Sequence, residues 1–213
     1  MWTHKDNFQA LRQKGIALLH RASVLSGRAA AGCPMDEAMW DDITATCRAT
    51  LAFARGLPDF RLPEYDVHNP DAIGSILAIA HAAAYSAVIQ VHGIVALAQP
   101  LAREEQLKAA KRAMVIVKEM STARPSYIPH FFGWALAPIH KFLLREKMQL
   151  EELHHEAGAA AVQSDLNALS HTLRRVGELY PIPASVLAEM LDRNVETLKL
   201  EMVGKQMNLS GGP

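Results

Sequence analysis

Four polar or aromatic side chains on otherwise apolar segments are the candidates for a binding site. They are His81, Tyr85, His92 and Trp134. His81 and Tyr85 are one helical turn apart and can form a hydrogen bond, whereas His81 and His92 are separated by about 16 Å along a helix axis and cannot share a metal ion. Because a buried imidazole usually needs only a local partner, a core role for His81 is favoured. If a small-molecule effector binds, we expect these four residues to line its pocket.

The charged stretch at residues 151–156 has the residue types of a metal site. Glu151 and His155, like Glu152 and Glu156, have the i,i+4 spacing of one helical turn. One turn supplies at most two ligands, whereas a metal site needs three or four. The stretch is therefore predicted to be a solvated charged face, and no metal ligand is predicted.

The remaining candidates for chemistry lack the surroundings that a reaction needs. Asp41 and Asp42 resemble the start of an aspartate-rich magnesium site, but no further acid follows at the next turn. Cys33 precedes a proline and Cys47 lies on an apolar stripe, where thiols are usually inert. Neither a G-x-S-x-G motif nor a phosphate-binding glycine loop occurs. We therefore predict no catalytic residue, no cofactor and no enzymatic activity.

The composition excludes several classes of protein. The 22 basic residues balance 22 acidic ones, so the chain lacks the basic footprint of a nucleic-acid surface. Two cysteines are too few for a disulfide-rich scaffold or a four-thiolate metal site. The first residues are polar and contain no apolar segment of signal-peptide length, so we expect an intracellular, reducing compartment.

Apolar residues recur every three or four positions along almost the whole chain, which predicts an all-α fold. The first helix is expected to stop at Gly27, and Pro138 is expected to kink or restart a helix. Residues 149–161 either continue a helix or form a loop. About seven helices are expected in a single irregular bundle over residues 1–203, followed by a disordered tail, 204–213. Their approximate ranges are 7–26, 35–55, 70–98, 101–121, 128–148, 162–180 and 184–203.

The helix at about 70–98 is the unusual element. No Asp, Glu, Lys or Arg occurs between Ala72 and Ala102, which is long enough to raise the question of a membrane span. Polar side chains interrupt it, alanine is only weakly apolar, and no Lys/Arg cluster flanks one end. We therefore predict no membrane insertion but a central helix buried on nearly all sides. Its alanines and Gly93 would let neighbouring helices approach closely.

A succession of segments carries a resemblance to a known family. ILAIAHAAAYSAVIQVHGIVA contains His81, Ile89 and His92, and it precedes REEQLKAAKRAMVIVKEM and PHFFGWALAPIHKFLL. The opening ALRQKGIALLHRASVLSGR and the later PIPASVLAEML belong to the same series. Together, over residues 8–195, they resemble the C-terminal part of the fungal-specific transcription factor domain, the regulatory region of fungal zinc-cluster regulators, in its basidiomycete form.

The resemblance implies a non-enzymatic regulatory or interaction domain that works in the nucleus. Its partners would be proteins of the transcription machinery or a second copy, with a small-molecule effector as a further ligand. Cys33 and Cys47 cannot form the family's six-cysteine DNA-binding cluster, so no direct nucleic-acid contact is expected and the chain would be a fragment or a truncated paralogue. Two alternatives stay open: a ligand-binding or enzyme domain with a buried pocket near His81, Tyr85 and Trp134, and a structural interaction module with an exposed apolar patch.

Overall fold

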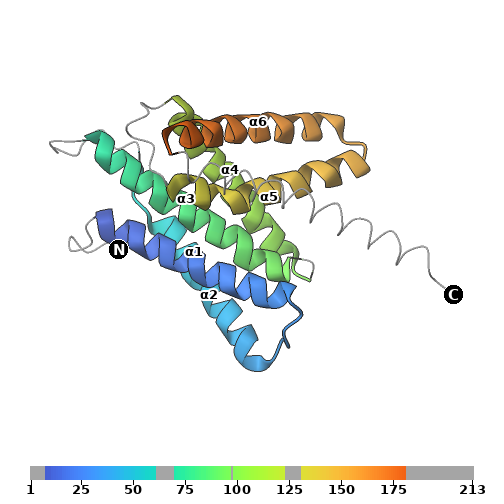
Figure 1. Ribbon diagram of the computed structural model, residues 1–213. Coiled ribbons are helices and arrows are strands. Elements are labelled where there is room, and N and C mark those ends of the chain that lie inside the picture. The colour runs from blue at the N-terminus through green and yellow to red at the C-terminus, as the bar shows by residue number, and fades with distance from the viewer. Residues whose placement is uncertain (1–7, 61–69, 97, 123–130, 181–213) are drawn as a thin grey trace.

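The computed structural model describes residues 8–60, 70–96, 98–122 and 131–180, and over these ranges the protein is entirely helical (Figure 1). The described residues form six helices and no strand: α1 (Phe8–Ala30), α2 (Glu37–Gly56), α3 (Pro70–Val95), α4 (Pro100–Thr122), α5 (Phe131–Glu152) and α6 (Glu156–Leu179). The predicted all-α class is confirmed. About seven helices are predicted for the whole chain, and the described part contains six. The expected helix at 184–203 and the tail at 204–213 lie outside the described residues.

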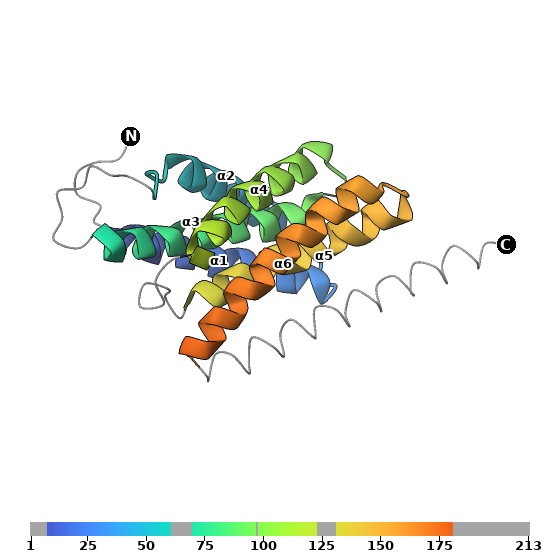
Figure 2. The ribbon, with the colours of Figure 1, turned by 90° about the horizontal axis from the view of Figure 1, so that it is seen from above.

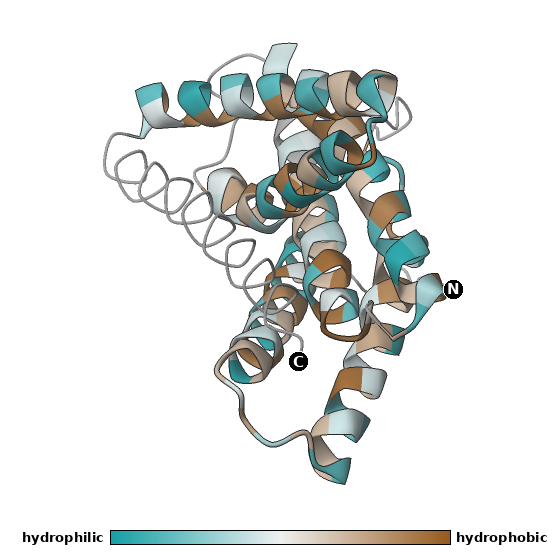
Figure 3. Ribbon diagram, turned by 90° about the vertical axis from the view of Figure 1, so that its right-hand side faces the viewer, coloured by the Kyte–Doolittle hydropathy of each residue, from teal (hydrophilic) through white to brown (hydrophobic). Residues whose placement is uncertain are grey.

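The alanine-rich helix α3 lies at the centre of the bundle, as predicted. Every residue from Leu77 to Ile89 is buried, because α1, α2, α4 and α5 all pack against it. The helix α6 packs on α4 and α5 and crosses them as an outer layer (Figure 2). Hydrophobic residues cluster on the inner sides of the helices, and hydrophilic ones face outward (Figure 3). A helix that is apolar all round requires this kind of enclosure.

The same helix has the length and composition of a membrane span over Gly74–Val95, and it is the single such helix in the described ranges. Within its most apolar window, 78% is buried inside the protein. Neighbouring helices therefore occupy most of the surface that lipid would otherwise cover.

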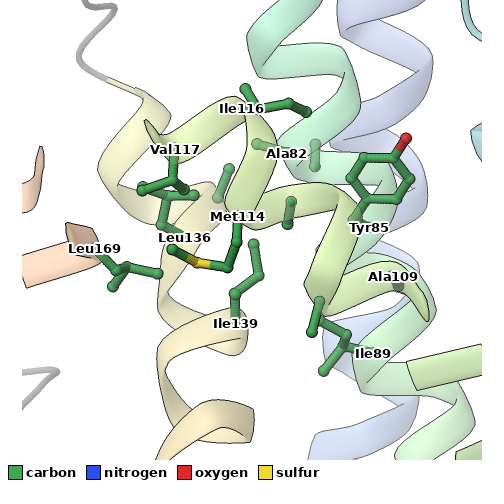
Figure 4. Close-up of a cluster of buried hydrophobic side chains, with 14 of the residues drawn as sticks. Ala82, Tyr85, Ile89, Ala109, Met114, Ile116, Val117, Leu136, Ile139 and Leu169 are labelled. Carbon is green, nitrogen blue, oxygen red and sulfur yellow. The ribbon is translucent and has the colours of Figure 1, made fainter. Parts of the chain in front are cut away.

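One hydrophobic cluster joins α3 to α4, α5 and α6. Figure 4 shows Ile89 from α3, Met114 from α4, Ile139 from α5 and Leu169 from α6 converging on a shared space. All four side chains are at most 4% exposed. Through this cluster α6 is tied to the centre of the bundle although it lies in the outer layer.

The close approach of α1 to α3 depends on Gly15. A Cβ atom placed on Gly15 would lie 3.0 Å from the Ala80 carbonyl oxygen and 3.4 Å from the Ala80 Cα. These are main-chain atoms of α3, which cannot swing aside as a side chain can. The absence of a side chain at Gly15 therefore sets the distance between the two helices.

We expect Gly15→Val to lower the free energy of unfolding by about 3 kcal/mol, because its side chain would be forced into the α3 backbone. Gly27→Val is the matched control, since nothing lies within 4 Å of a Cβ at Gly27 in the same helix. Urea denaturation of both variants measures the difference. Equal stability of the two variants would show that α1 and α3 do not need this contact.

The predicted end of the first helix at Gly27 is wrong. The helix continues to Ala30 because the following alanines are strong helix formers. It ends in a Schellman motif: the Cys33 amide donates to the Arg28 carbonyl at 3.0 Å, the Gly32 amide donates to the Ala29 carbonyl at 3.1 Å, and Gly32 has a φ of 72°. The termination falls here because Cys33 precedes a proline, which disfavours a helical conformation.

Within residues 149–161, α5 continues to Glu152 and α6 begins at Glu156, so a sharp turn at residues 153–155 separates two helices. The turn is a second Schellman motif, in which the His155 amide donates to the Leu150 carbonyl at 2.8 Å and the His154 amide donates to the Glu151 carbonyl at 3.0 Å. His154 takes the left-handed position, with a φ of 54°. His155 then caps α6, because its Nδ1 accepts the Gly158 amide at 3.0 Å.

His154→Gly should raise the free energy of unfolding by up to about 1 kcal/mol, since glycine adopts the left-handed conformation without the Cβ penalty. Gly32→Ala makes the opposite change in the equivalent position of α1 and should lower stability by about 1 kcal/mol. Melting midpoints of the two variants provide the measurement. A destabilised His154→Gly would mean that the histidine side chain contributes more than its backbone costs.

Pro138 lies inside α5, and the helix continues through it without the restart that was one predicted outcome. A proline removes the amide that would bond the carbonyl four residues earlier, here that of Trp134. In the same turn, the Ser86 hydroxyl of α3 donates a hydrogen bond to the Ala135 carbonyl. The interrupted turn of α5 is therefore held against α3 by a side chain of α3.

Candidate functional site

Of the four predicted site residues, the structure joins two. His81 and Tyr85 are buried on α3, with His81 Nδ1 3.3 Å from the Tyr85 hydroxyl. His92 is buried further along α3 and bonds the carbonyl of Val88 through Nδ1 at 3.0 Å. Trp134 lies on the first turn of α5 and is 41% exposed. Among the four, His81 and Tyr85 are the two that the described contacts bring together.

His81 and Tyr85 belong to a chain of hydrogen bonds that joins α3 to the segment after α2. The Tyr85 hydroxyl donates to His81 Nδ1, and His81 Nε2–H donates to the Pro58 carbonyl at 2.7 Å. The ring of Phe60 packs edge-on against His81, with centroids 6.0 Å apart. A neutral imidazole has one donor and one acceptor, and both are used here.

The surroundings of His81 and Tyr85 keep both side chains uncharged. Burial lowers the pKa of His81, against the bond to the Pro58 carbonyl, which acts to raise it. Burial raises the pKa of Tyr85, against the Arg112 charge, which acts to lower it. At neutral pH the histidine is therefore uncharged and the tyrosine keeps its proton. The arrangement holds the segment after α2 against α3, which agrees with the core role predicted for His81.

Two further histidines, His92 and His140, are buried, and neither belongs to a group of metal-ligating side chains in the described part of the chain. Burial lowers the pKa of His92, whose surroundings include an ion pair between Arg55 of α2 and Glu105 of α4 at 3.4 Å. Burial also lowers the pKa of His140 on α5, and its Nδ1 makes no hydrogen bond. Burial among the packed helices keeps both imidazole rings uncharged at neutral pH.

The other sequence candidates have structural partners. Asp42 forms an ion pair with Arg21 of α1 at 2.6 Å, on the surface. Burial raises the pKa of the Cys47 thiol to about 11, so it is not a reactive thiolate at neutral pH. His155 caps α6 and does not share a helical turn with Glu151. Over the ranges that the structure describes, no group of three His, Cys, Asp or Glu side chains comes together as metal ligands do.

A pocket that sequence reasoning missed lies where α1 ends against α3 and α5. Its volume is about 460 Å³, within the range of small-molecule sites. Its lining is mixed, with Lys141 and Arg145 as the charged residues. The other described lining residues are Ser26, Ala29, Ala30, Ile89, Gln90, Gly93, Ile94, Gln106, Pro138 and Phe142. None of the four predicted site residues is among them.

The one sequence signal for this pocket is local to α5. Lys141 and Arg145 are one helical turn apart beside Pro138 and Phe142, so an apolar and a basic group share one side of the helix. The last turn of α1 lies opposite these residues only because of the tertiary fold. The spacing of residues within α5 cannot predict this contact.

Comparison of the chain with protein-family models, with curated proteins and with solved structures gives no match. Its function is therefore inferred from the geometry of the chain and from the resemblance of its sequence to the family described above.

We predict that stability falls as the pH is lowered from 7.5 to 5.5. The pKa values of His81, His92 and His140 are lowered on folding, so below about pH 6.5 the unfolded chain takes up protons that the folded chain does not. Each such histidine contributes at most about 1.4 kcal/mol per pH unit until its folded pKa is reached. Melting midpoints across this pH range measure the loss.

His140→Phe should reduce this pH dependence, because the residue that titrates is removed and the ring makes no Nδ1 hydrogen bond to lose. The matched control is Ser164→Ala on the exposed side of α6, which removes no titrating group and should keep the slope of the wild type. An unchanged slope in His140→Phe would show that His140 takes up its proton equally in the folded and unfolded states.

Proposed function

We propose that this chain is a non-enzymatic regulatory and interaction domain of the kind found in fungal zinc-cluster transcription factors, acting in the nucleus. The proposal is supported by the series of helical segments that resembles this family and by the way the interior uses its polar groups. Contact with DNA would come from a cysteine cluster outside this chain, because its zero net charge and two cysteines supply neither a basic footprint nor zinc ligands.

The observation that carries the proposal is that buried polar side chains form hydrogen bonds to main-chain carbonyls of neighbouring helices. Gln106 of α4 donates to the Ile89 carbonyl of α3 at 2.6 Å, and Thr172 of α6 lies 3.4 Å from the Val117 carbonyl of α4. Ser86 of α3 bonds the Ala135 carbonyl of α5 in the same way. An active site would instead aim several such groups at one reacting atom. The interior therefore serves to hold helices together.

A partner would find its most distinctive contact surface on the first turn of α5. Phe131 and Trp134 are one turn apart and are 49% and 41% exposed, so two large aromatic rings share one side of the helix. Exposed tryptophans often contribute a large share of the binding energy at protein interfaces. We assign this aromatic pair to a protein of the transcription machinery or to a second copy of the chain.

The test is a reporter assay in which the chain is fused to a heterologous DNA-binding domain. We expect the fusion to change reporter transcription and Trp134→Ala to abolish most of that change, because the aromatic contact is lost. Val24→Ala on α1, also an exposed apolar residue at 47%, is the matched control and should behave as the wild type.

Light scattering of the same proteins separates the two partners. A wild-type dimer that becomes monomeric in Trp134→Ala assigns the aromatic pair to self-association, and a monomer throughout assigns it to another protein. A folded fusion that leaves transcription unchanged would contradict the proposed function.

The pocket at the end of α1 favours a second candidate, a helical domain that binds a small molecule. The sequence predicts such a pocket near His81, Tyr85 and Trp134, whereas the described pocket is lined by other residues. A compound that raises the melting midpoint in proportion to its concentration would support this candidate. The two functions are compatible, because an effector can regulate an interaction domain.

A further inference from the structure

The side chain of Gln106 is a buried amide with one of its two ends bonded inside the protein. Gln106 lies on α4 and is 7% exposed. Its Nε2 donates to the Ile89 carbonyl of α3 at 2.6 Å, and because a carbonyl only accepts, this bond fixes which end of the amide is the oxygen. Nε2 also lies over Gly93, since a Cβ there would come within 3.0 Å of it. The amide is thus held in one orientation against α3.

The oxygen of this amide is open to the pocket. Among the described residues, none donates a hydrogen bond to Gln106 Oε1, and this oxygen is not one of the unpartnered polar atoms that are sealed from solvent. Gln106 is a lining residue of the pocket of about 460 Å³ between α1, α3, α4 and α5. The pocket is therefore the side from which a hydrogen-bond donor can reach Oε1.

The charged residues of the lining do not require a charged ligand. Lys141 and Arg145 of α5 each already take part in an interaction within the protein. None of the described lining residues is Asp or Glu. A ligand of either charge is therefore not called for, and an uncharged one meets no unpaired ion that is shown here.

Most of the remaining lining is apolar. Large apolar side chains come from α3 and α5 and small ones from the end of α1, namely Ile89, Ile94, Pro138, Phe142, Ala29 and Ala30. Covering this surface removes it from water, which favours a ligand with an apolar body. A wholly apolar ligand would also shut solvent away from Gln106 Oε1 without replacing its hydrogen bond, which weakens binding.

We propose that this pocket binds a small uncharged molecule with an apolar body and one hydrogen-bond donor, an O–H or N–H group that donates to Gln106 Oε1. The apolar body lies against Ile94 and Phe142. The inference rests on the second candidate function, the binding of a small molecule in this pocket, and names the class of ligand. It does not depend on the regulatory function.

The test compares two pairs of compounds that differ only in the donor. 2-Naphthol has an O–H and indole has an N–H, whereas 2-methoxynaphthalene and 1-methylindole have a methyl group in place of that hydrogen. Isothermal titration calorimetry with the full chain measures each affinity. We expect at least one donor compound to bind saturably and about tenfold more tightly than its methylated partner, because the partner leaves a buried acceptor unpaired. The pair with the larger preference identifies the donor as O–H or N–H.

Gln106→Met removes the acceptor with little change in volume, so it should bring the two members of the pair to similar affinities. The matched control is Gln163→Met on α6, outside the pocket, which should keep the preference of the wild type. Melting midpoints verify that each variant is folded.

A second variant tests the pocket without touching the bond between Gln106 and Ile89. Ala30→Phe places a ring in the lining from an exposed position of α1, so it should weaken binding of the donor compound by about tenfold. Ala161→Phe, at an exposed position of α6, is its control and should bind as the wild type does.

The absence of saturable binding of both donor compounds to the wild type would overturn the proposal. Similar affinities within both pairs would overturn it too, because the donor would then be unnecessary. The same holds if folded Gln106→Met keeps the preference, or if Ala30→Phe binds as the wild type does. The second candidate function fails separately, when no compound of any class raises the melting midpoint, and the reporter assay tests the regulatory function on its own.

Discussion

The packing of four helices around the alanine-rich helix α3 is the constraint on which the rest of the structure depends. At Gly15 the backbones of α1 and α3 meet with no side chain between them. Alanine loses no rotamer freedom on burial, so a helix of alanines can be enclosed at small entropic cost. Its small side chains also let the neighbours approach closely, which increases dispersion contacts along the interface.

Six of the buried residues between Leu77 and Ile89 of α3 are alanines, whose small side chains do little to fix the orientation of the helix. Its polar residues supply that specificity: His81 bonds the Pro58 carbonyl, and Ser86 bonds the Ala135 carbonyl of α5. A buried donor without its acceptor costs about 1–3 kcal/mol, so each bond disfavours a rotated or shifted α3. The pocket lies where α1 and α3 both end, because Ser26, Ala29 and Ala30 of α1 line it together with Gln90, Gly93 and Ile94 of α3.

Sequence patterns were sufficient for the parts of this protein that are determined within one helix. The absence of charge between Ala72 and Ala102 predicted the buried α3, and the four-residue spacing of His81 and Tyr85 predicted their hydrogen bond. Helix ends were less predictable: Gly27 has the residue type of a terminator, but the signal that decided the end was Gly32 before Cys33–Pro34. Likewise, nothing in the types of His154 and His155 indicates that one takes a left-handed conformation and the other caps α6.

The candidate site was predicted least well, for a physical reason. A search for polar residues on apolar helices finds those that face a ligand and those that face a neighbouring carbonyl alike. His81 is of the second kind, because it faces the Pro58 carbonyl. The pocket depends on residues of four helices, such as Ala29, Gln106 and Arg145, which are far apart in the chain. Their proximity follows from how the helices cross α3 and not from any local spacing.

Native-state hydrogen exchange of the backbone amides tests the central role of α3 most directly. If the helix is enclosed as described, its amides from Leu77 to Ile89 exchange only when the whole protein unfolds, and their exchange free energy equals the free energy of unfolding from denaturant titration. The amides of α2, which packs on the edge of the bundle, should exchange faster through local opening. Exchange in α3 as fast as in α2 would contradict a fold organised around a buried central helix.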